Sequence, residues 1–152
     1  MDGQLTPYRV SVQDHWVDYN DHLNEGYYGV VFSDAGDHVL SQLGFSEEYR
    51  SGVGGTFYTA ETHTRYLAEV SADAEIAVVS LVVGVDSKRL HLWHDLRTDG
   101  RTAATQESMI LHVGIDSGRV APMPDDFVAR ARSLVVFGDT LDLCRSIRRV
   151  GR

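Results

Sequence analysis

The chain has 152 residues, of which 14 are Lys or Arg and 22 are Asp or Glu, so its formal net charge is −8. With 43% hydrophobic and 24% charged residues, the composition is that of an ordinary globular domain rather than a disordered chain. The acidic balance argues against general nucleic-acid binding, because contacts to phosphates need clustered Lys and Arg. A chain of this length is expected to fold as one domain, residues 1–152.

Other features concern the cellular compartment. The apolar runs, such as residues 81–83, are far too short to span a bilayer. The N-terminal residues lack the basic start and the apolar core of a signal peptide. The single cysteine, Cys144, cannot form a disulfide within the chain, which fits a reducing compartment. We therefore expect a soluble cytoplasmic protein that does not bind a membrane.

The predicted elements begin with a strand and a long helix. Residues 8–13 alternate apolar and polar side chains, which is typical of a strand. From Asn24, apolar residues recur at steps of three and four, which indicates a helix that ends near Gly44. Asn24 is suited to cap this helix, with Glu25 in its first turn. The buried face is predicted to carry Tyr28, Val31, Phe32, Ala35, Val39 and Leu43.

Glycines interrupt the interior of this helix. Gly26, Gly29 and Gly36 each cost up to about 1 kcal/mol relative to alanine. We therefore expect something to pack very close to the helix backbone, although a frayed first turn would also account for Gly26.

Four strands and a helical segment follow. After a Gly-rich loop at 51–55, apolar patterns predict the strands 56–67, 75–85, 88–98 and 102–115. The close turn signals between them predict an antiparallel meander. Beyond two prolines, residues 125–134 are predicted to form a helix and 139–149 a second helical turn or tail. The element order predicts an α+β fold, a sheet around one long helix, with its core at 8–116 and a helical tail at 122–152.

The strand at 75–85 is apolar on both sides, so both faces of the sheet must be covered. The long helix covers one face, and no element of this chain is predicted to cover the other. Because dimerisation would supply the missing layer, we expect a homo-oligomer.

The densest group of polar side chains, residues 18–25, lies between the first strand and the helix. A helix N-terminus offers free N–H groups and a partial positive charge, which suit an oxygen that gains negative charge in a reaction. The carboxylate of Asp18 could attack a carbonyl held there or activate a water. His22 and Asn24 could orient the carboxylate, the water or the loop. The alternative is structural, since such residues often form caps and Asx-turns.

The stretch VDYNDHLNEGYYGVVFSDAGDHVL resembles the loop-and-helix signature of hotdog-fold acyl-CoA thioesterases of the 4-hydroxybenzoyl-CoA thioesterase type. That family's pattern is Asp, two variable residues, Gly-His-Val-Asn and then the long central helix. Asp18, His22 and Asn24 match it, whereas Asp21 stands at the family's Gly and Leu23 at its Val.

The resemblance implies a hotdog fold and a homodimer or homotetramer with active sites at the subunit interface. It implies no metal, and no cofactor apart from the coenzyme A of an acyl-CoA substrate. The family's catalytic acid maps onto Asp18, and its carbonyl-polarising backbone N–H onto the first turn of the helix, near Glu25 and Gly26. Family members differ on whether the carboxylate is a nucleophile or a general base, and both roles stay open.

Several strand segments look closest to the thioesterases of bacterial carnitine catabolism, which hydrolyse betainyl-CoA. These segments are WVDYNDH, FYTAETHTRYL, KRLHLWH and ATQESMILHV. The resemblance therefore implies an enzyme that releases glycine betaine and CoA. Aromatic faces attract a trimethylammonium group by about 0.5–2 kcal/mol per ring, although such rings also serve in cores and interfaces. The candidate rings are Trp16, Tyr19, Tyr27, Tyr28, Tyr58 and Trp93.

Further candidates lie on the predicted strands. Glu61 and His63, two residues apart on one face, could contribute to the partner subunit's site or form an interface hydrogen bond. Cations for the CoA phosphates are expected from residues at strand ends, unless these are merely solvated charges. The candidate cations are Arg65, Lys88 and Arg89.

Two rival functions differ in class. One is a thioesterase for an aromatic or medium-chain acyl-CoA, since aromatic walls also suit an uncharged aromatic group. The other is a noncatalytic module that binds an acyl-CoA or a small cation on the same scaffold. Asp18 argues against the second, because a pure binder needs no carboxylate beside a reactive carbonyl.

Overall fold

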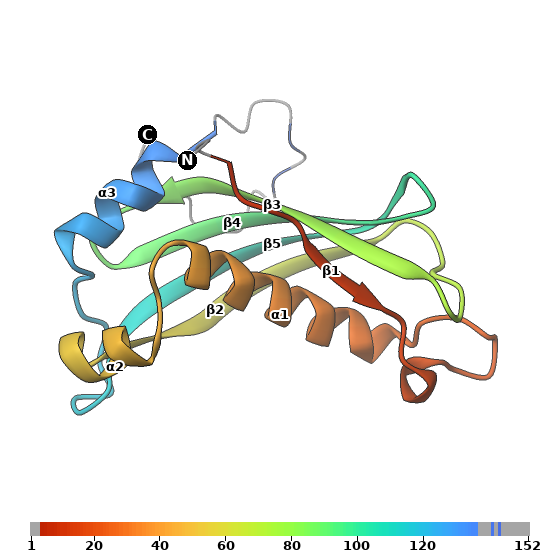
Figure 1. Cartoon of the computed structure of the whole chain (residues 1–152), viewed down its shortest axis with the longest axis horizontal. Coiled ribbons are helices and arrows are strands. Elements are labelled where there is room, and N and C mark those ends of the chain that lie inside the picture. The colour runs from red at the N-terminus through yellow and green to blue at the C-terminus, as the bar shows by residue number, and fades with distance from the viewer. Residues whose placement is uncertain (1–3, 137–140, 142, 144–152) are drawn as a thin grey trace.

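The computed structural model describes residues 4–136, 141 and 143. In chain order its elements are β1 (Tyr8–Ser11), the 3-10 helix η1 (Asp14–Trp16), α1 (Glu25–Gln42), α2 (Glu47–Val53), β2 (Gly55–Tyr66), β3 (Glu75–Val85), β4 (Arg89–Thr98), β5 (Arg101–Gly114) and α3 (Asp125–Ser133). The strands form one antiparallel sheet that curls around α1 (Figure 1). The predicted α+β architecture and the C-terminal helix are confirmed, whereas the predicted turn or tail at 139–149 falls almost wholly outside the described residues.

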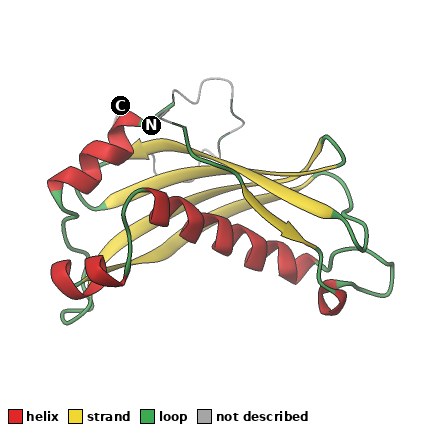
Figure 2. Ribbon diagram, viewed as in Figure 1, coloured by secondary structure: helices red, strands yellow, loops and turns green. Residues whose placement is uncertain are grey.

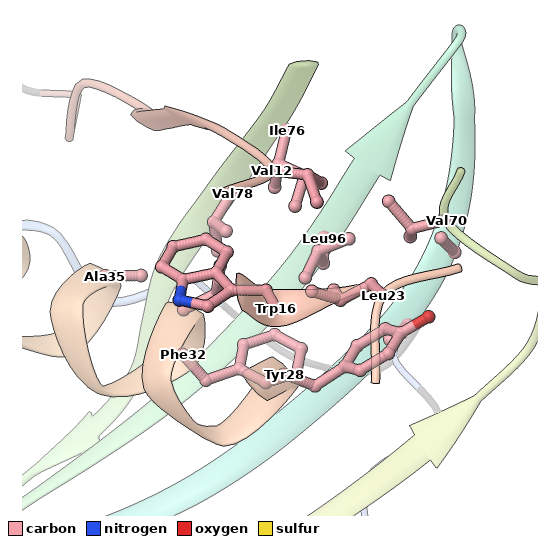
Figure 3. Packing of buried hydrophobic residues seen from close by; sticks show 13 residues of the cluster. Val12, Trp16, Leu23, Tyr28, Phe32, Ala35, Val70, Ile76, Val78 and Leu96 are labelled. Carbon is pink, nitrogen blue, oxygen red and sulfur yellow. The ribbon is translucent and has the colours of Figure 1, made fainter. Parts of the chain in front are cut away.

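The helix α1 lies along one face of the sheet, with α2 and α3 at the far end (Figure 2). Its start is capped as predicted, because Asn24 Oδ1 accepts the N–H of Gly26 at 2.9 Å. Gly44, with φ of +103°, follows its end. All six residues of the predicted face are buried, and several pack against β3 and β4 (Figure 3). Within the described residues, no helix has the length and apolar character needed to cross a membrane.

The strand order is β1-β3-β4-β5-β2, which differs from a simple meander. β3, β4 and β5 follow one another as predicted, but β2 pairs with β5 instead of β3. The prediction of four consecutive neighbours is therefore wrong. The physical reason is the connection at 67–74, which is longer than a hairpin loop and lets β2 occupy the opposite edge of the sheet.

The short helix α2 replaces part of the predicted Gly-rich loop. Its start is capped by Ser46, whose Oγ accepts the N–H of Tyr49 at 3.1 Å, and it ends at Gly54, with φ of +68°. Ser46 followed by two glutamates was a usable N-terminal signal. The helix was nevertheless not predicted, because it is short and glycines lie near its end.

The glycines of α1 do not meet a close neighbour within the described chain. A Cβ built at Gly29 or Gly36 would find no atom within 4 Å, and one at Gly26 would meet only Asn24 Oδ1 at 3.4 Å. The close packing expected at these glycines is therefore not found within the described chain. Gly29 and Gly36 instead line a hollow of about 320 Å³ between α1 and the sheet.

The face of the sheet away from α1 is also covered more fully than expected. His94 of β4 contacts Phe32 of α1, so the alternate residue Trp93 points to the other face. Trp93 is nevertheless only 7% exposed and Glu107 is 0% exposed within a single chain. The prediction of an open face was based on regular elements alone. The low exposure of Trp93 and Glu107 shows that this face is more covered than regular elements alone predict. The segment after α3 extends the edge of β3, where Val136 N–H donates to Val82 O at 2.9 Å.

The buried His94 generates a prediction about pH. Burial lowers the pKa of His94 to about 4, from an ordinary value of 6.5. Its Nδ1 lies 2.7 Å from Ser80 Oγ. Between these two pH values the unfolded chain binds the proton more readily than the folded protein, so stability falls as the pH falls. As the pH falls from 6.5 to about 4, the free energy of unfolding of the parental protein should decrease. We expect this decrease to exceed that of His94→Gln by up to about 3 kcal/mol.

Denaturant unfolding of both proteins at several pH values measures this difference. The exposed His15→Gln serves as the control and should follow the parental curve. Identical pH dependence of parental and His94→Gln stability would contradict the prediction.

Candidate active site

Residues 17–23 form a tight turn that holds Asp18 beside the start of α1. Val17 and Leu23 pair as an antiparallel bridge, and the N–H of Asp18 donates to the carbonyl of His22 at 2.9 Å. The N–H of Asn24 donates to the carbonyl of Trp16 at 2.8 Å. These bonds fix the turn to the first residue of the helix cap.

The same turn is bound to the connection between β2 and β3. Leu23 N–H donates to the Val70 carbonyl at 2.7 Å, and Ala72 N–H donates to the Asp21 carbonyl at 3.0 Å. Figure 3 shows Leu23 and Tyr28 beside Val70 at the edge of this core. The sequence-distant segment 66–72 is thereby brought next to Asp18.

The two oxygens of the Asp18 carboxylate have different surroundings. Oδ1 accepts the N–H of Asn20 at 2.8 Å and that of His22 at 3.4 Å, which is an Asx-turn arrangement. Oδ2 has no hydrogen-bond donor among the described residues. The structural and the chemical interpretations of Asp18 are therefore compatible, because one oxygen holds the turn and the other accepts no hydrogen bond from the described residues.

Asp21 has a left-handed backbone, with φ of +59°. This conformation costs a residue other than glycine roughly 1–2 kcal/mol, and Asp and Asn tolerate it best. The family pattern has glycine at this position. The chain thus keeps the backbone shape that glycine favours, although its side chain differs.

Asp18 opens into a cleft of about 480 Å³ at the N-terminal end of α1. The lining residues come from the turn, the first turn of α1 and the segment after β2: Asp18, His22, Leu23, Glu25, Tyr28, Tyr66, Leu67, Ala68 and Glu69. The rings of Tyr28 and Tyr66 meet edge to face, with centroids 5.1 Å apart and planes at 88°. Tyr28 is buried, whereas Tyr66 is half exposed.

The charges in the cleft are mostly negative. Burial is the main cause that raises the pKa of Tyr28, and the nearby Tyr66, Glu69 and Asp18 raise it further. Burial, and then the charge of Glu25, raises the pKa of Tyr66. Both hydroxyls therefore stay neutral near neutral pH. The backbone N–H of Glu69 and the nearby Arg101 lower the pKa of the Glu69 carboxyl, which therefore stays ionised.

The first turn of α1 supplies one unused backbone donor to this cleft. The N–H of Gly26 is taken by Asn24 Oδ1 and that of Tyr27 by the Asn24 carbonyl, both at 2.9 Å. The N–H of Glu25 has no acceptor among the described residues. The sequence motif predicts that the backbone N–H of Glu25 or Gly26 polarises a carbonyl. Of these two N–H groups, only that of Glu25 lacks an acceptor among the described residues.

Of the aromatic candidates, only Tyr28 lines the cleft. Trp16 and Tyr27 stack on each other, with centroids 5.8 Å apart, and belong to the packing beside the helix start. Tyr19 is 96% exposed, and Tyr58 lines a different hollow near α2. Trp93 lies on the opposite face of the sheet.

Glu61 and His63 share a strand face as predicted, but that face is turned away from α1. Tyr66 contacts Tyr28 on the helix side, so Arg65, His63 and Glu61 alternate to the other side. Within one chain these side chains do not reach the cleft.

Lys88 and Arg89 lie at the wrong end of the sheet to serve the same chain's cleft. The turn with Asp18 contacts the residues just before β3, whereas Lys88 and Arg89 follow its end. β3 has 11 residues, so the two ends are roughly 35 Å apart. Arg89 is also paired with Asp86 at 2.7 Å. Arg101 does contact the segment that lines the cleft, because its Nη2 donates to the Glu69 carbonyl at 3.2 Å.

Sequence reasoning missed the segment from Tyr66 to Glu69. No local pattern marks these residues as part of a site, because their approach to Asp18 follows from the pairing of β2 with β5. Within the described part of the chain, no three His, Cys, Asp or Glu side chains are grouped to hold a metal ion.

A curled antiparallel sheet around one helix, with a carboxylate at the helix start, defines the hotdog class of acyl-thioester enzymes. The chain belongs to the Thioesterase-like superfamily, whose sequence profile matches residues 12–131. The resemblance inferred from the motif around Asp18 and the hotdog fold are thereby confirmed.

Individual relatives agree with this family. A betainyl-CoA thioesterase from Pseudomonas aeruginosa is 36% identical over 152 residues, covering 99% of this chain and 96% of the relative. An L-carnitine dehydrogenase/betainyl-CoA thioesterase from Agrobacterium fabrum is 44% identical over 124 residues, covering 81% of this chain and 25% of that protein.

Two solved structures are similar over nearly the whole chain. A protein from Pseudomonas putida KT2440, described as a candidate thioesterase, has a TM-score of 0.78 and 34% identity, covering 98% of this chain and 96% of its own. A hypothetical protein from Staphylococcus aureus, solved in complex with CoA, has a TM-score of 0.84 and 26% identity. The match covers 97% of this chain and 98% of that protein.

The left-handed residue in the turn generates a prediction. Asp21→Gly should leave the free energy of unfolding unchanged or raise it, because glycine adopts this backbone without strain. Asp21→Val should lower it by about 1–3 kcal/mol, because a β-branched side chain is strained there. Denaturant unfolding measures both variants. If Asp21→Val proved as stable as Asp21→Gly, the turn would not have the geometry described.

Proposed function

We propose that this protein hydrolyses betainyl-CoA to glycine betaine and CoA. The observation that carries the proposal is the carboxylate of Asp18, held by its Oδ1 with Oδ2 free, in a cleft at the start of α1. The choice of substrate is supported by the near full-length similarity to a protein named betainyl-CoA thioesterase. A neighbour solved with CoA supports an acyl-CoA as the substrate class.

In the proposed reaction the thioester carbonyl lies between Asp18 and the first turn of α1. The Glu25 N–H and the positive end of the helix dipole stabilise the negative charge that develops on the carbonyl oxygen. Asp18 Oδ2 either attacks the carbonyl carbon or takes a proton from the attacking water. If Asp18 attacks, Oδ2 forms a bond to the carbonyl carbon, the carbon–sulfur bond breaks, and water then hydrolyses the resulting anhydride and restores the carboxylate. If Asp18 acts as a base, the oxygen of water forms the new carbon–oxygen bond as the carbon–sulfur bond breaks. In either case a proton from water ends on the sulfur of CoA. The thiol of CoA and the carboxylate of glycine betaine leave.

Asn24 and His22 have supporting roles in this scheme. Asn24 holds the start of the helix through its bond to Gly26, and so positions the Glu25 N–H. The backbone N–H of His22 helps to orient the Asp18 carboxylate, and its imidazole lines the cleft. We infer that the reaction needs no metal and no cofactor other than the CoA of the substrate, and that it takes place in the cytoplasm.

The role of Asp18 is tested by Asp18→Asn. Asparagine keeps an oxygen that can accept the N–H groups of Asn20 and His22, so the turn should survive while the reactive charge is lost. We expect kcat for betainyl-CoA to fall by roughly 10²–10⁴-fold. Release of CoA thiol, followed with a thiol-reactive dye, measures the rate.

Asp14→Asn is the matched control, because Asp14 is an exposed carboxylate near the turn but outside the cleft lining. It should keep the parental rate. Circular dichroism of Asp18→Asn should match the parental spectrum. Turnover of Asp18→Asn at the parental rate would refute the assignment of this carboxylate.

We infer further that the working enzyme is a homo-oligomer assembled along β2. One side of β2 is not paired within the described chain, and an unpaired edge of 12 residues invites a second strand. The half-exposed Leu67 at the cleft rim and the exposed Tyr58 on β2 are the apolar surfaces that a second copy would bury. Such a copy could also bring Arg65, Glu61 or His63 to the neighbouring cleft.

Light scattering after size exclusion tests this inference. The expected mass corresponds to two chains or a multiple of two. A fully active monomer would contradict an interface site.

A further inference from the structure

The covalent structure of a betainyl group restricts where its cation can bind. The quaternary nitrogen is separated from the thioester carbon by one methylene, as in the backbone of glycine, so the two atoms are only about 2.5 Å apart. A carbonyl placed beside Asp18 therefore carries the trimethylammonium group into the same cleft. Within the same chain, this short distance excludes aromatic residues that lie outside the cleft, such as Trp93 and Tyr58.

The cleft contains an aromatic corner that suits such a cation. Tyr28 and Tyr66 have perpendicular planes with centroids 5.1 Å apart, and both line the cleft. At this distance the edge of one ring touches the face of the other, so the pair offers a ligand in the cleft the ring faces that this contact leaves uncovered. Ring faces attract cations. Tyr28 is fixed, because it is 5% exposed and packed in the core, whereas 51% of Tyr66 is exposed and available to a ligand.

The charges around this corner have the sign that a cation requires. Glu69 and Asp18 lie close enough to Tyr28, and Glu25 close enough to Tyr66, to raise the pKa of each hydroxyl. The described lining residues include these three carboxylates and no Lys or Arg. Arg101 contacts the segment through the backbone carbonyl of Glu69 and offsets part of the negative charge.

We propose that Tyr66 and Glu69, together with the fixed ring of Tyr28, form the subsite for the trimethylammonium group and so determine acyl specificity. This inference rests on the proposed hydrolysis of betainyl-CoA. Tyr66 supplies the accessible ring, and Glu69 supplies long-range attraction from the exposed rim. The subsite selects a quaternary ammonium acyl group over an uncharged group of the same shape.

The test compares betainyl-CoA with 3,3-dimethylbutanoyl-CoA, in which carbon replaces the quaternary nitrogen. For Tyr66→Leu we expect kcat/KM for betainyl-CoA to fall by about 2- to 30-fold, with the value for the neutral substrate changed by less than about twofold. Tyr66→Phe keeps the ring and should stay within about twofold of the parental enzyme for both substrates. Tyr8→Leu, at a tyrosine of β1 outside the cleft lining, is the control for loss of a tyrosine.

Glu69→Gln tests the charge separately. Because Glu69 is exposed, we expect a loss of about 2- to 5-fold for betainyl-CoA alone, and this loss should vanish in about 1 M salt. Equal losses for both substrates in Tyr66→Leu, or no loss in either, would overturn the proposed subsite.

Binding without turnover separates failure of the subsite from failure of the proposed function. Two thioethers of CoA that cannot be hydrolysed, one with a 2-(trimethylammonio)ethyl group and one with a 3,3-dimethylbutyl group, are titrated by calorimetry. The parental protein should bind the cationic thioether more tightly, and Tyr66→Leu should lose that preference. No preference in the parental protein would overturn the subsite. Preference without hydrolysis of betainyl-CoA would support the subsite and refute the proposed reaction.

Discussion

The candidate site depends on a small set of backbone hydrogen bonds around the turn at 17–23. Asp18 is not part of α1, so its position relative to the helix start is set by the bond from Asn24 N–H to the Trp16 carbonyl and by the closure of the turn itself. The bond from Leu23 N–H to the Val70 carbonyl holds the second wall of the cleft against the first. Loss of these bonds would separate the carboxylate from the helix N-terminus without changing either element.

This constraint explains why the polar residues of the turn combine structural and chemical roles. Asp18 Oδ1 is used to close the turn, and Asn24 Oδ1 is used to cap the helix. What remains for chemistry is the second oxygen of Asp18 and the N–H of Glu25. Asp21 accepts a left-handed backbone so that the turn can close, at a cost that its short polar side chain keeps small.

The cleft is assembled from segments that are far apart in the sequence, and the selectivity proposed for it depends on that assembly. The turn and the first turn of α1 supply the carboxylate of Asp18 and the helix N-terminus. The end of β2 and the connection after it supply Tyr66 and Glu69. Carboxylates of both segments raise the pKa of the same two tyrosines. The negative potential of the cleft therefore arises only when folding brings the two segments together.

The sequence alone determined the strands, the long helix α1 with its polar N-terminal end, and the C-terminal helix, but not the short helix α2. Helix periodicity, the Asn24 cap and the apolar faces of β3 depend on neighbours a few residues away, and the motif around Asp18 is a local signature that led to the right family. Only the tertiary structure decided that β2 lies beside β5, that Tyr66 and Glu69 join Asp18, that Trp93 is buried on the opposite face, and that Lys88 lies a sheet's length away. The physical reason is that strand order depends on packing and hydrogen bonding between segments far apart in the sequence. These interactions do not change the pattern of apolar and polar residues within either segment.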